Sequence, residues 1–193
     1  QGSVSNQSFQ RIDNWVVDGV TRQPNTPQGQ IVYRKTEFKD LVGYNLKGGL
    51  NYNINSQHNV FANGGYYSRQ PFFNGVYPSN RQVLNPNLTN EKIIGAELGY
   101  GFRTSNLKAN VNLYRTSWKD RFQRRGGLTI DPDNNPATQN SIQNAYAEVN
   151  GIEQIHYGAE IETTYMIGQY IELEGMFSIG DWRYKGNAAG SLF

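Results

Sequence analysis

Strict alternation of apolar and polar residues over positions 92–120 is the feature that most constrains the fold of this chain. A period of two places alternate side chains on opposite faces of a β-strand. The alternation is interrupted only around Ser105-Asn106, which predicts two strands joined by a two-residue loop. This loop sets the facing pairs Leu98 and Leu113, Tyr100 and Val111, Phe102 and Ala109, and Gly101 and Asn110.

The same alternation recurs along the chain and predicts about seven strands. They are expected at 2–17, 41–55, 59–69, 92–103, 107–120, 145–166 and 170–184. Their connections alternate between long and short: long loops are expected at 18–30, 70–90 and 122–144, and short turns at 56–58, 105–106 and 167–169. A three-residue turn at 56–58 places Asn51 opposite Asn63, and one at 167–169 places Glu162 opposite Glu174.

Strand length and loop asymmetry together indicate the fold class. Several of the strands exceed the five or six residues that are usual in soluble sheets. Transmembrane β-barrels have strands of about 9 to 11 residues, short turns on one side and long loops on the other. Aromatic residues near the strand ends suit the interfacial girdles of such a barrel: Tyr44, Tyr52, Tyr66, Tyr100, Phe102 and Tyr165. The sequence therefore predicts an all-β, antiparallel, up-and-down transmembrane barrel segment.

A water-soluble β-sandwich binding module, of the carbohydrate-binding or adhesin type, is the alternative, because its strands also alternate when one face is core. The two predictions differ in where the apolar face points. A barrel directs it outward to lipid, and a sandwich buries it against a second sheet. Six residues decide between them: Leu46, Leu50, Leu98, Val111, Ile161 and Leu173.

Composition excludes several classes of function. A net charge of +2 without a run of lysines or arginines argues against nucleic-acid binding. The absence of cysteine excludes disulfides and thiolate chemistry. The mean hydropathy is -0.68, and the sequence contains no apolar run long enough for a membrane helix. A membrane barrel is still compatible with this, because its apolar residues alternate with polar ones.

We expect no catalytic site, metal site or cofactor. His58 and His156 lie about a hundred positions apart, without acidic or hydroxyl partners at motif spacing. Residues 131–136 begin like a calcium loop, but Pro136 replaces the required glycine and Ile142 the bidentate glutamate. An outer-membrane enzyme is therefore disfavoured.

An ordered set of segments resembles the TonB-dependent outer-membrane receptors. Residues 85–103, NPNLTNEKIIGAELGYGFR, resemble the "NP-x-L" and "ELGY" strand of that family, and 59–73, 110–122, 158–162 and 173–184 are similar to further barrel segments in the same order. The resemblance implies a barrel of about 22 strands, plugged by an N-terminal domain. It also implies a bacterial outer-membrane location and import of a scarce nutrient, an iron chelate or an oligosaccharide, with energy from the TonB complex.

The chain is too short for such a whole receptor, so we expect residues 1–193 to form part of the barrel, with the plug domain and the remaining strands absent. The expected partners are outer-membrane lipid and, through the missing N-terminal part, the TonB complex. A surface lipoprotein or another outer-membrane complex is left open.

Two sets of site residues follow. Arginines beside aromatics can hold an anionic chelate, whereas aromatics with amides can stack on sugars; the candidates for substrate contact in the outer loops and upper lumen are Arg69, Arg81, Trp118, Arg121, Arg124, Arg125 and Trp182. Carboxylates on the polar face are candidates for docking basic side chains of the plug: Glu160, Glu162, Glu172 and Glu174.

Overall fold

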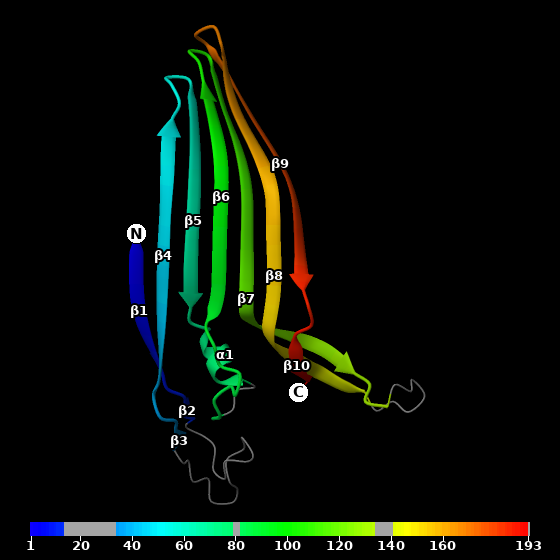
Figure 1. The fold of residues 1–193 in the computed structure, drawn as a ribbon. Helices are drawn as coiled ribbons and strands as arrows, with labels where there is room; N and C mark the ends of the chain where they lie inside the picture. The colour runs from blue at the N-terminus through cyan, green and yellow to red at the C-terminus, as the bar shows by residue number, and fades with distance from the viewer. Residues whose placement is uncertain (14–33, 79–81, 134–140, 193) are drawn as a thin grey trace, which may run out of the picture.

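A computed structural model describes residues 1–13, 34–78, 82–133 and 141–192 of the protein. These residues form one long antiparallel sheet and a separate pair of two-residue strands (Figure 1). None of the helices among them has the length and apolarity needed to cross a membrane.

The large sheet is a meander in which consecutive long strands are neighbours. Its strands are β1 (Gly2–Phe9), β4 (Lys39–Asn53), β5 (His58–Arg69), β6 (Glu91–Arg103), β7 (Leu107–Ile130), β8 (Ile142–Ile167), β9 (Ile171–Lys185) and β10 (Ala189–Leu192). Both β9 and β10 pair with β8, at successive positions along it. The small pair consists of β2 (Ile12–Asp13) and β3 (Arg34–Lys35), and one short helix, α1 (Phe73–Val76), precedes β6.

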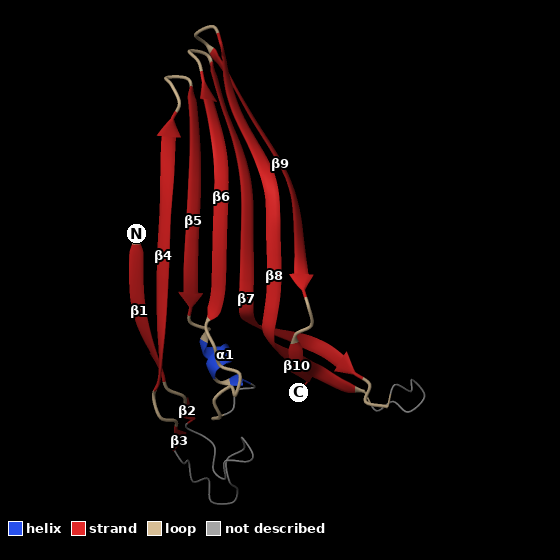
Figure 2. Ribbon diagram, viewed as in Figure 1, coloured by secondary structure: helices blue, strands red, loops and turns tan. Residues whose placement is uncertain are grey.

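Short turns gather at one end of the sheet and long connections at the other, as expected (Figure 2). The helix α1 and the pair β2–β3 lie at the long-loop end. The expected loop at 18–30, positions 14–17 of the first predicted strand, and Arg81 lie outside the described residues.

The register between β6 and β7 confirms the prediction. Leu98 faces Leu113, Tyr100 faces Val111, Phe102 faces Ala109 and Gly101 faces Asn110. The Thr104 backbone N–H donates to the Leu107 carbonyl at 2.7 Å, which closes the two-residue loop Ser105–Asn106.

The two three-residue turns are each displaced by one residue, so both predicted facing pairs are wrong. The first loop begins at Asn55, because its side-chain oxygen accepts hydrogen bonds from the backbone N–H groups of Gln57 and His58, at 2.9 Å each. Asn51 consequently faces Phe61, and Asn63 faces Gly49.

The second loop begins at Gly168, which adopts the left-handed conformation with a φ of 63°. Ile167 therefore pairs with Ile171, Glu162 with Met176, and Thr164 with Glu174. The predicted direct contact between two carboxylates is absent, because a one-residue displacement of the turn moves the register by two and leaves the faces unchanged.

The predicted long loop at 122–144 is also wrong, because β7 continues to Ile130 and β8 begins at Ile142. The pairing accommodates the polar, glycine-containing sequence through register shifts after Trp118, Arg121, Arg125 and Leu128. Asp120 and Asn144 take positive φ values of 58°, and Gly127 takes 71°. The resulting bulges bend the hairpin away from the main sheet (Figure 1).

The buried apolar residues lie at the long-loop end. Val76, the last residue of α1, and Tyr77 after it are buried, as are Ala145 and Ile152 on β8. Buried Asn85 links the 70–90 connection to β8, since its side-chain amide donates to the Gly75 carbonyl at 3.0 Å and to Asn150 at 2.9 Å. These contacts hold the connection between β5 and β6 against β8.

Candidate functional site

The apolar face of the sheet is exposed along its whole width. Of the six residues chosen to test the fold, five are between 41% and 81% exposed, and Val111 is half-buried. A sandwich would bury all six against a second sheet, and the only other sheet among the described residues is the two-residue pair β2–β3. The apolar face is therefore an exterior surface and not a core.

Tyrosines bound this apolar face on two strands. The segment from Tyr44 to Tyr52 on β4 and the segment from Tyr157 to Tyr165 on β8 are each nine residues long, both tyrosines included. Nine residues is the length that a tilted strand needs to cross the hydrocarbon layer. The outward positions between them hold only apolar or small residues and one threonine: Leu46, Gly48, Leu50, Ala159, Ile161 and Thr163.

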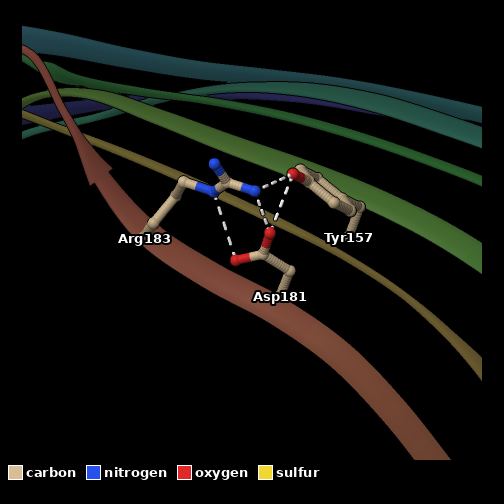
Figure 3. A network of polar contacts seen from close by, with 3 residues as sticks. All are labelled: Tyr157, Asp181 and Arg183. Atoms are coloured by element: carbon tan, nitrogen blue, oxygen red, sulfur yellow. Dashed lines mark hydrogen bonds and ion pairs between the residues drawn. The ribbon is translucent and has the colours of Figure 1, made fainter.

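A polar network marks the long-loop boundary of the apolar face (Figure 3). Arg183 on β9 donates to the Tyr157 hydroxyl at 2.6 Å and pairs with Asp181. The Tyr157 hydroxyl donates to Asp181 at 3.0 Å. The tyrosine thus joins the apolar surface on one side to a charged pair on the other, which is how aromatic residues bridge a lipid–water interface.

The opposite, polar face carries an aromatic cluster on β7, β8 and β9. His156 lies with its ring centroid 4.5 Å from that of Trp118 and 6.4 Å from that of Trp182. The indole N–H of Trp182 donates to the Tyr114 hydroxyl at 3.2 Å. We call Tyr114, Trp118, His156 and Trp182 the aromatic shelf.

Two glycines make room for the aromatic shelf. A Cβ atom at Gly158 would lie 2.8 Å from the Tyr114 hydroxyl oxygen, and one at Gly180 would lie 2.8 Å from the Trp182 ring. Both rings therefore occupy space that a neighbouring side chain would fill. Tyr114 of β7 thus lies over the backbone of β8, and Trp182 lies over the backbone of its own strand.

Arginines at the long-loop end of the polar face are paired with buried carboxylates. Glu91, whose side chain is 8% exposed, pairs with Arg69 and with the Arg121 Nε at 2.7 Å. Arg124 lies 3.8 Å from the buried carboxylate of Glu148 and stacks on the Tyr146 ring at 4.1 Å. These ion pairs stabilise the fold, because a buried carboxylate that loses its cation lowers the stability of the folded state.

The polar face of β4 to β8 contains a hollow of about 680 Å³. Gly49, Gly65 and Gly95 contribute no side chain to its floor. Ionic and aromatic groups stand around it, including Lys47, Glu97, Glu160, Tyr67 and Tyr114. No group of three or more potential metal ligands occurs among the described residues.

A family comparison decides what this two-faced sheet is. The family model for the β-barrel of TonB-dependent receptors, described as "TonB dependent receptor-like, beta-barrel", matches residues 11–191. The chain belongs to this family. Comparison with curated proteins and with solved structures gave no match.

TonB-dependent receptors are a family of outer-membrane transporters, so the apolar face is the lipid-facing surface and the polar face lines the lumen. The short turns then lie on the periplasmic side and the long connections on the outer side. The aromatic shelf and the Glu91 network stand on the lumen face towards the outer end.

The predicted substrate residues that the structure describes separate into three sets on this receptor wall. Trp118 and Trp182 come together on the shelf, whereas Arg69, Arg121 and Arg124 are engaged by glutamates. Arg125 is exposed on the bent outer hairpin.

The four predicted plug-docking glutamates share the lumen face. Glu160 faces Asn112 and Ser178, and Glu162 faces Asn110 and Met176. Glu172 and Glu174 follow on β9 with the same alternation, opposite Met166 and Thr164.

Sequence reasoning missed three residues of this site: Tyr114, His156 and Glu91. His156 and Trp182 face each other across β8 and β9, and Thr116 faces His156 across β7 and β8. The alternation places all of these residues on the polar face. The register across the 131–141 connection brings His156 to Trp118, whereas the β8–β9 hairpin, whose short turn was predicted one residue too early, brings it to Trp182.

Proposed function

We propose that this chain forms part of the barrel wall of a TonB-dependent transporter that imports a scarce nutrient into the periplasm. The observation that carries the proposal is a single sheet with an exposed apolar face, bounded by tyrosines, and a lumen face with charges and an aromatic shelf. Energy for transport would come from the TonB complex of the inner membrane, as in the rest of the family.

We further propose that residues 1–193 are one sector of a larger barrel, of about 22 strands by family likeness. Among the strands that the structure describes, β1 and β9 stand at the edges of the sheet, and their backbone hydrogen-bonding groups need partners inside a bilayer. Additional strands supply them when the sheet closes.

Uptake measurements in cells test the transport proposal. Cells that express the full receptor are compared with cells that lack it, each with and without a functional TonB complex, for accumulation of candidate nutrients. We expect accumulation only where receptor and TonB complex are both present. Accumulation that persists without the TonB complex contradicts the proposal.

The lumen glutamates support a second part of the proposal, namely docking of basic side chains from the plug. Glu162 and Glu174 face only uncharged residues, and Glu160 accepts one hydrogen bond, from Ser178 at 3.5 Å. A cluster of carboxylates without cations across the strands is complementary to a basic surface.

Replacing Glu160, Glu162, Glu172 and Glu174 with glutamine in the full receptor should loosen the plug. Faster hydrogen exchange of plug amides is the expected result, because the plug loses opposite charges at its contact surface. Glu37→Gln, at an exposed site in the outer-end connection, is the matched control. Unchanged plug protection in the fourfold variant would show that these carboxylates do not dock the plug.

A further inference from the structure

We propose that the aromatic shelf binds neutral sugar rings, which makes the nutrient an oligosaccharide and not an anionic iron chelate. The inference rests on the transport function proposed above and names the substrate class of that same lumen face. The groups that carry it are Trp182, Trp118, His156 and Tyr114.

The Trp182 ring has a fixed position. Its edge is held by the hydrogen bond to Tyr114, and the ring occupies the space beside Gly180. Trp182 is nevertheless 59% exposed. A ring that is held in place but still exposed offers an apolar surface on which the C–H groups of a sugar ring can stack, at little cost in side-chain entropy.

Uncharged polar groups surround the shelf. The facing positions on β7, β8 and β9 form two consecutive rows without a charged side chain: Thr116, His156 and Trp182, then Trp118, Gln154 and Tyr184. The Gln154 side-chain oxygen accepts from Arg121 at the edge of the second row. Its amide N–H groups, with the hydroxyl and imidazole groups, match the acceptors and donors of sugar hydroxyls. A neutral, polyhydroxylated ring therefore finds both an apolar surface and hydrogen-bonding groups.

Four of the arginines that could bind an anionic chelate are paired with carboxylates. Arg69 and Arg121 share Glu91, Arg124 pairs with Glu148, and Arg183 lies on the lipid-facing side with Asp181. From the shelf to the short turns, the described lumen face of β4 to β9 has three cations against five carboxylates: Lys47, Arg103 and Lys108 against Glu97, Glu160, Glu162, Glu172 and Glu174. This balance repels an anionic substrate.

A second, smaller cavity extends the shelf towards the outer end. It has a volume of about 180 Å³ and is lined by Gln154 and Tyr184, which lie in one row with Trp118 of the shelf. Its remaining lining comes from Arg121, Phe122, Gln123 and Ile152. The cavity continues the binding surface beyond the tryptophans, as a chain of more than one sugar requires.

Calorimetric titration of the purified full receptor tests the inference. The neutral probes are maltohexaose, xylohexaose and cellohexaose, and the anionic probes are ferric citrate and ferric enterobactin. We expect at least one neutral probe to bind, and Trp182→Ala to weaken that binding by about tenfold or more, because the stacking surface is lost. Trp182→Phe, which keeps an aromatic face, should recover most of the affinity.

Tyr170→Ala is the matched control, because Tyr170 is 94% exposed in the periplasmic turn at the far end of the sheet. Binding of ferric chelates alone, binding of none of the sugars, or sugar binding that Trp182→Ala leaves unchanged would each overturn the carbohydrate assignment. TonB-dependent uptake of a ferric chelate would then preserve the transport proposal while the assignment fails. Loss of TonB-dependent uptake for every probe would remove both.

Discussion

The two faces of the sheet differ in how regular they are. The lipid-facing side repeats one simple composition, with apolar or small residues between tyrosines on both β4 and β8. The lumen side changes from place to place: a glycine-floored hollow on β4 to β6, an aromatic shelf on β7 to β9, and an ion network near the outer end.

This difference follows from what each face contacts. Lipid is uniform, so any apolar residue of suitable size satisfies an outward position. A lumen side chain lies across its neighbours, as Tyr114 lies beside Gly158, so its identity depends on the residue that faces it. The residue at a lipid-facing position therefore depends only on its own strand. The residue at a lumen position depends also on the residue that faces it on the neighbouring strand.

The largest difference between the two faces is expected when a charge is placed on each face of one strand. Leu50→Arg puts the charge among outward residues of β4 and should lower the free energy of unfolding by about 2–4 kcal/mol if it reaches the middle of the bilayer. Asn51→Arg, its lumen-facing neighbour, should change it by less than about 0.5 kcal/mol. Urea titration of the full receptor in phospholipid vesicles measures both, and equal losses would contradict the assignment of the faces.

Removing the buried carboxylate of the ion network should have the next largest effect. Glu91→Gln leaves Arg69 and Arg121 without their anion, and we expect a loss of about 2 kcal/mol, below the usual range for buried pairs because Arg69 is half exposed. The same titration measures the loss. Glu37→Gln, at an exposed position, should have no measurable effect.

A methyl group at Gly158 tests whether a lumen position depends on its neighbours. Gly158→Ala brings a Cβ to 2.5 Å from the Ile179 carbonyl and displaces the Tyr114 ring, for an expected loss of about 1–3 kcal/mol. Gly48→Ala, on the lipid face of β4 where nothing lies within 4 Å, should be close to neutral. Similar losses at both glycines would refute the claim that only lumen positions depend on their neighbours.

The smallest effect concerns the turn that sets the β4–β5 register. Asn55→Ala removes the acceptor for two backbone N–H groups, and we expect about 0.5–1.5 kcal/mol less stability, because the turn is exposed and water replaces the bonds. Ser56→Ala, in the same loop, is the control. Hydrogen exchange at Gln57 and His58 reports the change locally, and unaltered exchange would argue against the cap.

The faces of the sheet could be predicted from the sequence, and one register could as well. Alternation alone separated Leu98 from Glu97, and the two-residue loop fixed the partner of each residue on β6 and β7. The two three-residue turns were misplaced by one residue, because the side-chain cap of Asn55 and the left-handed Gly168 decide where each loop starts. Such local choices move partners by two positions and leave the faces intact.

The lumen site was harder to predict for a different reason. Trp118 and Trp182 were candidates because of their type and face. His156 meets Trp118 through a pairing that spans a long connection, and it meets Trp182 across a hairpin turn that was predicted one residue too early. The same applies to the arginines. Nothing in the local sequence shows that Glu91 lies between Arg69, some twenty residues earlier, and Arg121, thirty residues later.

The consecutive pairing of β9 and β10 along one edge of β8 has a mechanical consequence. Between the two contacts lie Gly151, with a φ of 72°, and Gly186, with the same value, so the backbone can turn at this level on both strands. On the short-turn side of these glycines, β8 is hydrogen-bonded into the membrane wall. On the outer side, β8 forms the bent hairpin with β7 and pairs with β10. The two glycines therefore act as a corner of the sheet, where the outer part turns away from the wall that carries the shelf (Figure 1).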